Sequence, residues 1–460
     1  MFALPGITLL IIFILARPQE FIPLLQKIPF LHLGAALASI GFVVDLRLKR
    51  LQPVATNTLP WVIAFLAWAV LSLAINAPEQ IPRWGLEMVI LFVLYGTIAH
   101  GIQRFRTFQF VSGILCTTCL FIAFVCFHQG LSPQQCVGGE AVEGGVEGTP
   151  TGRLCESHLQ CQQDPERDPE LVYRCEHVGL FDTYSIDNRV RYAGELRDPN
   201  EVALTMSAGG IALLLGFSLR RRRAASHLAV GLGIALILAT VWLTKSRGGL
   251  VAAMLVPFVY AVRRYGWRAI IPAILVAVPV LMLGGRSDAS ATESTMNRYE
   301  AWVAGLDMFK HSPIYGVGAR MFSDHHWITA HNSFVLTLAE MGIVGITLFV
   351  SIIYLCMKTL LVGLARLRYI PGTAAPQVWG MALLAAMSGI IFQINTLSFA
   401  YHSVLWLFFG LVGAWYSAVR HHLPELDIKI RLPDFAVICL LVFGYAFVAL
   451  PVYLKYKGLM

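Results

Sequence analysis

Long apolar runs separated by short charged clusters are the feature of this 460-residue sequence that most limits its fold. A helix needs roughly 20 mostly apolar residues to cross the hydrocarbon core of a bilayer, and runs of this kind recur along the whole chain. Only 13% of the residues are charged, against about 25% in a typical soluble protein. The composition therefore excludes a water-soluble enzyme, a nucleic-acid-binding protein and a disordered scaffold.

The apolar runs predict an all-α fold, a polytopic integral membrane helical bundle of about 12–13 transmembrane helices with two long periplasmic loops. The first run has neither a clear basic n-region nor a cleavage site, so we expect it to be retained as a helix. The predicted helices lie near residues 4–17, 28–45, 58–76, 85–99, 107–128, 200–219, 226–244, 248–262, 268–284, 332–356, 376–394, 399–418 and 434–453.

Basic clusters predict the orientation of these helices, because cytoplasmic loops carry an excess of Lys and Arg. Clusters follow every second predicted helix, at Arg47/Lys49/Arg50, Arg104/Arg106, Arg220–Arg223, Arg263/Arg264/Arg268, Lys358/Arg366/Arg368 and Arg420/Lys429/Arg431. This alternation accounts for most of the net charge of +8 and predicts a cytoplasmic N-terminus. Lys455 and Lys457 fit the rule poorly if the last helix spans, so that span stays open.

The resulting organisation has five parts. They are N-terminal transmembrane helices (1–128), a periplasmic loop with disulfides (129–199), central transmembrane helices (200–284), a periplasmic catalytic loop with an amphipathic helix (285–331) and C-terminal transmembrane helices (332–460). Loops longer than roughly 15 residues are usually functional or disordered, and the 129–199 stretch can be partly both.

The 129–199 loop contains four cysteines, and an even number in an oxidising compartment predicts two disulfides. Three pairings are possible, and the alternative is a zinc site, although no close CxxC pair supports it. The candidates are Cys136, Cys155, Cys161 and Cys175.

Four polar groups of residues lie in or beside the two loops, at 189–201, 245–249, 297–300 and 324–333. Arg247 interrupts two apolar stretches, where an unpaired guanidinium costs about 3 kcal/mol. It is either a ligand-binding group or an arginine that reaches from a helix end to the membrane surface.

Residues 293–312 predict an amphipathic helix on the outer face, capped by Thr292 or Ser294 and ended by Pro313. Arg298 lies one turn before Trp302, and it is either an anchor for lipid headgroups or a substrate-binding cation.

Histidine can act as a base near neutral pH, so His331 is either a catalytic base or a helix cap. Asp324, His325 and His326 have side chains of the kinds that bind zinc or manganese, so a metal site is the alternative. Their spacing matches no recognised metal-binding motif. Glu340, inside a predicted span, is either functional or a partner for a neighbouring helix.

Three basic positions and one possible base at the outer surface suit a diphosphate, because arginine offers a planar fork of donors to phosphate oxygens. Glycosyl transfer from a lipid diphosphate needs cations for the departing diphosphate, a base for the acceptor hydroxyl and a groove for the lipid tail.

At these positions the sequence resembles the O-antigen ligase/polymerase superfamily, closely over about 190–350 and elsewhere only by hydropathy. The matching stretches are Arg191-Tyr-Ala-Gly194 with Asp198-Pro199-Asn200; Ser246-Arg247-Gly248-Gly249; Arg298 with His311-Ser-Pro313-Ile-Tyr-Gly316-Val-Gly318; and Ala330-His331-Asn332-Ser333 continuing to Leu338-Ala-Glu340-Met-Gly342-Ile-Val-Gly345. Arg17-Pro18-Gln19-Glu20 is similar to a branch linked to exopolysaccharide and exosortase systems.

The resemblance implies an inverting, metal-independent glycosyltransferase without cofactors, in the bacterial inner (plasma) membrane with its active site on the periplasmic face. It implies that Arg247 and Arg298 bind the diphosphate of an undecaprenyl-diphosphate-linked glycan and that His331 activates the acceptor hydroxyl. Further substrate-binding candidates are Arg191, Asn200, Lys245, Asn332 and Tyr299.

The acceptor stays open. A ligase of lipopolysaccharide biosynthesis joins the glycan to lipid A core, a polymerase extends an O-antigen or exopolysaccharide glycan, and an oligosaccharyltransferase modifies protein. The expected partners are the lipid-linked donor, one of these acceptors and membrane lipid, with no nucleic acid. A lipid-linked glycan transporter is the alternative from another class, and it predicts broken helices and charges near mid-membrane.

Overall fold

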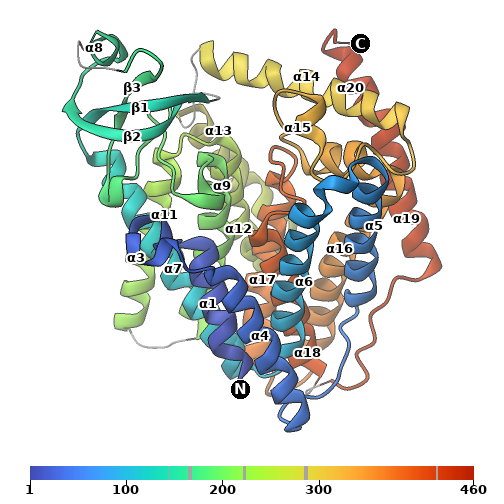
Figure 1. Cartoon of the computed structure of the whole chain (residues 1–460). Helices are drawn as coiled ribbons and strands as arrows, with labels where there is room; N and C mark the ends of the chain where they lie inside the picture. The colour runs from blue at the N-terminus through green and yellow to red at the C-terminus, as the bar shows by residue number, and fades with distance from the viewer. Residues whose placement is uncertain (143–144, 164–167, 221–223, 284–288, 421–422, 460) are drawn as a thin grey trace. The chain divides into compact units, whose positions relative to one another are not determined.

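The computed structural model describes residues 1–142, 145–163, 168–220, 224–283, 289–420 and 423–459. Most of these residues are helical, and the structure confirms an all-α polytopic membrane fold (Figure 1). Arg221, Arg222 and Arg223 of the predicted basic cluster lie outside the described residues, as do residues 285–288 of the second predicted loop.

Eleven helical stretches among the described residues are long and apolar enough to cross a membrane. The sequence predicts about 12–13, and two details account for the difference. The predicted helices 248–262 and 268–284 form one joined stretch, Arg247–Met282, and the first helix, Ala3–Leu15, has only 13 residues. The last apolar stretch, Leu432–Tyr456, is among the eleven.

The chain divides into two compact units. Unit 1 comprises Met1–Leu10, Phe30–Ser112 and Ala291–Met460, and unit 2 comprises Ile11–Pro29 and Gly113–Ser290. Three of the described helices have residues in both units: α1 (Ala3–Leu15), α7 (Phe105–Leu131) and α14 (Ala289–His311), whose first two residues belong to unit 2.

Unit 1 contains most of the C-terminal helices. Its elements are α4 (Phe30–Arg47), α5 (Leu59–Asn76), η1 (Pro78–Gln80), η2 (Ile81–Gly85), α6 (Leu86–Gly101), α14 (Ala289–His311), α15 (Phe322–His325), α16 (Ser333–Leu367), α17 (Ala374–Gln393), α18 (Ser403–Arg420), α19 (Leu432–Gly444), η7 (Tyr445–Ala449) and α20 (Leu450–Tyr456).

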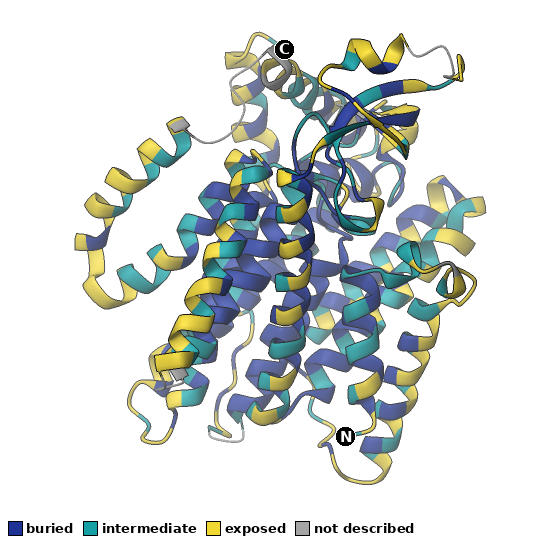
Figure 2. Ribbon diagram, turned by 90° about the vertical axis from the view of Figure 1, so that its left-hand side faces the viewer, coloured by how far each residue is buried: buried dark blue, intermediate teal, exposed yellow. Residues whose placement is uncertain are grey.

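Helix α18 is the centre of unit 1, because every residue from Ser403 to Val419 is buried. It packs on α6 and α17, and its side chains include the fully buried Trp406 and Trp415. Peripheral helices such as α4 bury one side and expose apolar residues on the other, as the alternating colours of Figure 2 show. This pattern is expected for helices that meet lipid.

The start of α1 packs closely on α4 through small residues. A Cβ added at Gly6 would meet the backbone of Ala38, and one added at Gly41 would meet the backbone of Phe2. Such close approach is typical of membrane helices that associate by van der Waals packing. The buried Asp45 accepts a hydrogen bond of 3.0 Å from the Ala3 amide, so a carboxylate caps the N-terminus of α1.

Unit 2 contains most residues of the first predicted loop (129–199) and the central helices. Its elements are α2 (Pro18–Phe21), α3 (Pro23–Gln26), β1 (Gln134–Val142), β2 (Gly145–Leu154), α8 (His158–Gln162), β3 (Val172–His177), η3 (Leu180–Asp182), η4 (Gly194–Leu196), α9 (Pro199–Thr205), η5 (Met206–Ala212), α10 (Leu213–Arg220), α11 (Ala224–Leu243), α12 (Arg247–Tyr265), η6 (Gly266–Ala269) and α13 (Ile270–Leu283).

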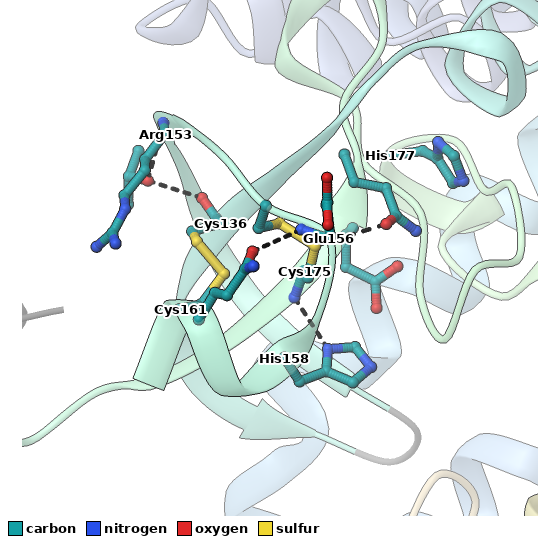
Figure 3. Close-up of a disulfide and its surroundings, with 12 residues drawn as sticks. Cys136, Arg153, Glu156, His158, Cys161, Cys175 and His177 are labelled. Carbon is teal, nitrogen blue, oxygen red and sulfur yellow. Dashed lines mark hydrogen bonds between the residues drawn. A yellow bond between two sulfur atoms is a disulfide. The ribbon is translucent and has the colours of Figure 1, made fainter. Parts of the chain in front are cut away.

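A three-stranded antiparallel sheet, in the order β2-β1-β3, occupies the stretch that the sequence predicts only as a long loop. Two disulfides join its parts, Cys136–Cys161 and Cys155–Cys175, and this is one of the three possible pairings (Figure 3). Cys136 and Cys175 are register partners on β1 and β3, and each bonds to another segment. The sulfurs of Cys136, Cys155 and Cys161 lie within 4.8 Å of one another.

Candidate functional site

The predicted site residues divide between the two units. Unit 2 holds Arg191, Asn200, Lys245 and Arg247, and unit 1 holds Arg298, Tyr299, His331 and Asn332. Within each unit, the predicted site residues lie in helices or in the loops that lead into them.

In unit 1, His331 lies at the junction between a loop and helix α16, and its backbone is left-handed, with φ of 44°. That region is uncommon for a residue other than glycine and persists only where the surroundings hold it. The next two residues supply that support. The buried Asn332 is the N-cap of α16, and its amide oxygen accepts hydrogen bonds from the backbone of Phe334 and Val335.

The segment 394–402 fixes the chain on both sides of His331. Ser333 donates its hydroxyl to the carbonyl oxygen of Leu397 at 2.7 Å and accepts from the Phe399 amide at 2.8 Å. On the other side, the hydroxyls of Thr329 and Ser398 are 2.8 Å apart. The half-buried His331 therefore lies between two anchored residues, and its position is set by the backbone.

Helix α14 is attached next to His331. The indole of Trp302 donates a hydrogen bond of 2.8 Å to the carbonyl oxygen of Ala330. Arg298 lies one helical turn before Trp302, and its Nε is buried without a hydrogen-bond partner among the described residues. α14 begins at Ala289, so the predicted caps Thr292 and Ser294 are wrong, because both lie inside the helix.

Aromatic contacts hold α14 against the C-terminal helix. The hydroxyls of Tyr299 and Tyr453 are 2.8 Å apart, and Trp302 also contacts the Tyr453 ring. Phe309 packs edge-on against Phe447 in η7, so α14 runs beside η7 and α20 (Figure 1). Tyr299, a predicted substrate-binding residue, thus also anchors the helix.

In unit 2, the extended segment 189–191 meets the ends of several helices. Arg189 donates from Nε to the carbonyl oxygen of Thr244 at 2.9 Å and from a terminal nitrogen to the side-chain oxygen of Asn200 at 3.1 Å. Asn200 lies in the first turn of α9, which Asp198 and Glu201 close as a capping box. Asn200 is therefore held by Arg189 and Asp198.

Arg191 is buried and bonded within the protein. Its guanidinium donates to the carbonyl oxygens of Tyr184 and Val146 and lies over the Tyr184 ring, 4.6 Å from the centroid. Burial lowers the pKa of this guanidinium below its ordinary value. Since Val146 is in β2, Arg191 ties the sheet to the segment that leads into α9.

The start of α12 lies close to this segment, because Arg189 bonds to Thr244 just before the helix. Ser246 is its N-cap and accepts a hydrogen bond from the Gly249 amide at 3.1 Å. A Cβ added at Gly249 would meet the Cβ of Ala203, so this glycine allows α12 to approach α9. Lys245 and Arg247 flank the buried Ser246, and both are exposed. The backbone of Lys245 is left-handed, with φ of 49°.

In unit 1, helix α16 is also interrupted. The break is at Gly342, where φ is 63°. Residues 312–318 fill the break. The amides of Val317 and Gly318 donate to the carbonyl oxygens of Ala339 and Glu340, each at 3.0 Å. The Ile343 amide donates to the carbonyl oxygen of Pro313 at 2.8 Å, so backbone groups released by the break find partners.

Residues 232–350, about a quarter of the chain, match the family described as O-antigen ligase. This match supports the resemblance of the chain to the O-antigen ligase/polymerase superfamily. No curated protein matches the chain significantly.

The O-antigen ligase match covers Lys245, Arg247, Arg298, Tyr299, His331 and Asn332, together with the broken helix around Gly342. Arg191 and Asn200 lie outside it. The family supports an O-antigen ligase-like membrane enzyme that uses a lipid-linked glycan donor and a glycan acceptor.

Sequence reasoning missed a charged cluster to which the matched segment contributes Arg320. Arg320, with φ of 69°, forms an ion pair with Glu87 at the start of α6. Its guanidinium lies over the rings of Trp84 and Tyr401, 5.4 and 5.0 Å from their centroids. The only local signal is the position of Arg320 just after Gly316 and Gly318, both at positive φ.

Glu340 completes this cluster. Its carboxylate accepts a hydrogen bond of 3.1 Å from the Phe322 amide, and its other oxygen is buried without a hydrogen-bond partner in the described part of the chain. Burial, with the nearby Glu340 carboxylate, raises the pKa of the Tyr401 hydroxyl well above its usual value, so this hydroxyl stays protonated. The alternative that Glu340 is a structural partner is compatible with these contacts.

Among the residues that the structure describes, one cluster has three or more potential metal-binding side chains close together. That cluster is Cys136, Cys155 and Cys161, and each sulfur belongs to a disulfide. Asp324 and His325 are exposed, whereas His326 is half-buried with Nδ1 3.1 Å from the carbonyl oxygen of Ile328. The Asp324–His326 stretch therefore forms a surface turn at the end of α15.

Proposed function

We propose that this protein is a membrane glycosyltransferase of the periplasmic face, which moves a glycan from undecaprenyl diphosphate to an acceptor hydroxyl. The observation that carries the proposal is the attachment of α14 at the residue before His331, since it keeps the turn that bears Arg298 near a potential base. The O-antigen ligase match over the same residues supports it.

His331 acts as the base in this proposal and takes the proton of the acceptor hydroxyl as the oxygen attacks the anomeric carbon. The bond between that carbon and the diphosphate oxygen breaks, and the configuration inverts. Arg298 and Arg247 stabilise the charge that develops on the departing diphosphate, which needs preorganised cations. No resident metal or cofactor is part of the proposal.

The remaining residues position these groups. Arg191 and Asn200 shape the donor side of unit 2 through contacts with the sheet, Arg189 and α9. Lys245, beside the α12 cap, adds a cation, Asn332 fixes the first turn of α16, and Tyr299 anchors α14. A helix break is also a feature of transporters, but here residues 312–318 bond the exposed backbone groups.

The test is complementation of a deletion strain with Arg247→Ala, Arg298→Ala and His331→Ala, with membrane insertion monitored. Each variant is expected to abolish glycan transfer while the protein still inserts. Full activity in all three contradicts the site assignment. In the deletion strain itself, lipid-linked polymer together with short lipopolysaccharide indicates a ligase. Accumulated single repeat units indicate a polymerase, and loss of glycan from secreted protein indicates an oligosaccharyltransferase.

A further inference from the structure

The linker between α4 and α5 lies at an end of unit 1 that is rich in basic residues. Gln52 and Gln103 exchange two hydrogen bonds, of 2.9 and 2.7 Å, so the linker is tied to the end of α6. Exposed cations surround this place, at Arg47, Lys49, Arg50, Arg104 and Arg106.

Three cavities of unit 1 meet at the linker residues Gln52–Ala55. They measure about 380, 290 and 620 Å³, and each has at least one of these linker residues in its wall. The three cavities therefore lie next to one another, on different sides of the same short linker.

The first cavity is apolar. Its walls come from α4 and α6 and include Phe42, Val43, Phe92 and Val93. Val43 is also half exposed and continues an outward apolar row with Leu37 and Ile40, so the cavity adjoins a surface suited to lipid. Gly96 lines this cavity, and a Cβ added there would meet no atom within 4 Å.

The other two cavities have mixed walls, with more polar side chains than the first, and both are lined by Arg420. Lys429 lines the larger one and pairs with Asp427 at 2.8 Å, whereas the contact found for Arg420 among the described residues is the Tyr416 ring, 5.9 Å from its centroid. The charges at this cavity therefore sum to a positive value. Asn57 adds a buried side-chain oxygen without a hydrogen-bond partner in the described part of unit 1.

We propose that this end of unit 1 binds an anionic membrane phospholipid, with an acyl chain in the apolar cavity and the phosphate near Arg420 and Lys429. An apolar wall that continues into a cationic one fits an amphiphile with a negative head. Basic residues near a membrane surface attract anionic lipids by about 1 kcal/mol each. This site is separate from the proposed glycosyl-transfer site, so either can fail without the other.

The experiment measures lipid binding to the purified full chain by native mass spectrometry, with phosphatidylglycerol and phosphatidylcholine of identical acyl chains. Phosphatidylglycerol is expected to bind at least about five-fold more tightly. Arg420→Gln is expected to weaken phosphatidylglycerol binding by about five-fold and to leave phosphatidylcholine unchanged. Gly96→Leu, which fills the apolar cavity, is expected to weaken both.

Matched controls separate this site from general surface charge. Arg368→Gln removes an exposed cation that lines none of the three cavities, and Gly231→Leu adds the same side chain on α11, where a Cβ also meets no atom within 4 Å. Equal binding of the two lipids, unchanged binding in Arg420→Gln, or an equal loss in Arg368→Gln overturns the proposal.

Inorganic phosphate serves as a third probe. If it displaces phosphatidylglycerol and Gly96→Leu has no effect, the site binds a free anion and the lipid proposal is wrong. Should Arg420→Gln fail to fold, Lys429→Gln provides the same comparison from the other cation of the larger cavity.

Discussion

The indole nitrogen of Trp302 lies 2.8 Å from the carbonyl oxygen of Ala330, so an amphipathic helix is bonded to the residue that precedes His331. The contact links two segments that are 28 residues apart in sequence. The position of His331, the proposed base, therefore depends on helix α14, which also carries Arg298.

Trp302→Phe keeps an aromatic ring and removes the hydrogen bond. A neutral hydrogen bond contributes about 1 kcal/mol, so we expect kcat for glycan transfer to fall about five-fold with little change in KM for the donor. Trp327→Phe, which changes an exposed indole, is the control. An unchanged kcat in Trp302→Phe, measured with purified enzyme and lipid-linked glycan, argues against the positioning role.

Arg298→Lys keeps the charge but replaces a two-pronged donor with a single ammonium group. We expect at least about a ten-fold loss of transfer, because a point charge does not reproduce bidentate contacts to phosphate oxygens. Lys310→Arg on the same helix changes an exposed residue paired with Asp307 and is expected to be neutral. Full activity of Arg298→Lys would show that a general positive charge is sufficient.

The pair Arg320–Glu87 is suited to a charge-swap experiment. Each side chain is about one third exposed, so water screens the pair, yet a single reversal places two like charges side by side under Trp84 and Tyr401. We expect Arg320→Glu to reduce transfer about ten-fold and the double variant Arg320→Glu/Glu87→Arg to recover part of it. An equal loss in both variants would show that the ion pair with Glu87 is not the reason for the effect of Arg320→Glu.

Removal of metal ions is expected to leave the reaction intact. Purified protein supplied with undecaprenyl-diphosphate-linked glycan should transfer it equally well with and without EDTA, since the proposal relies on arginine side chains for the charge of the diphosphate. A parallel sample receives Mg²⁺ in excess of the chelator. Activity that disappears with EDTA and returns with Mg²⁺ would contradict the proposed mechanism.

Local patterns made much of this structure predictable. The apolar runs predicted the spanning helices because a helix in a bilayer depends on length and composition alone. Helical spacing around Trp302 likewise predicted α14, although its start at Ala289 was missed because the first turn has only small and polar side chains and does not continue the apolar pattern.

Features that depend on distant pairing were not predictable. Glu87 and Arg320 are 233 residues apart, and neither sequence neighbourhood indicates a partner. The sheet of β1, β2 and β3 was missed because β1 and β2 contain several glycines and lack the usual alternation of apolar residues, and β3 has only six residues. The disulfide pairing likewise required the register of β1 and β3.

The interruption of α16 at Gly342 has a practical consequence for protein engineering. Its backbone partners come from residues 313–318, and α5 adds two more, since Trp68 donates to the carbonyl oxygen of Met341 and Ser72 to that of Glu340. Chimeras that exchange the second loop between homologous enzymes should therefore transfer α5, residues 312–318 and the first half of α16 together. A graft of the loop alone would leave unmatched amides and carbonyls inside a membrane helix.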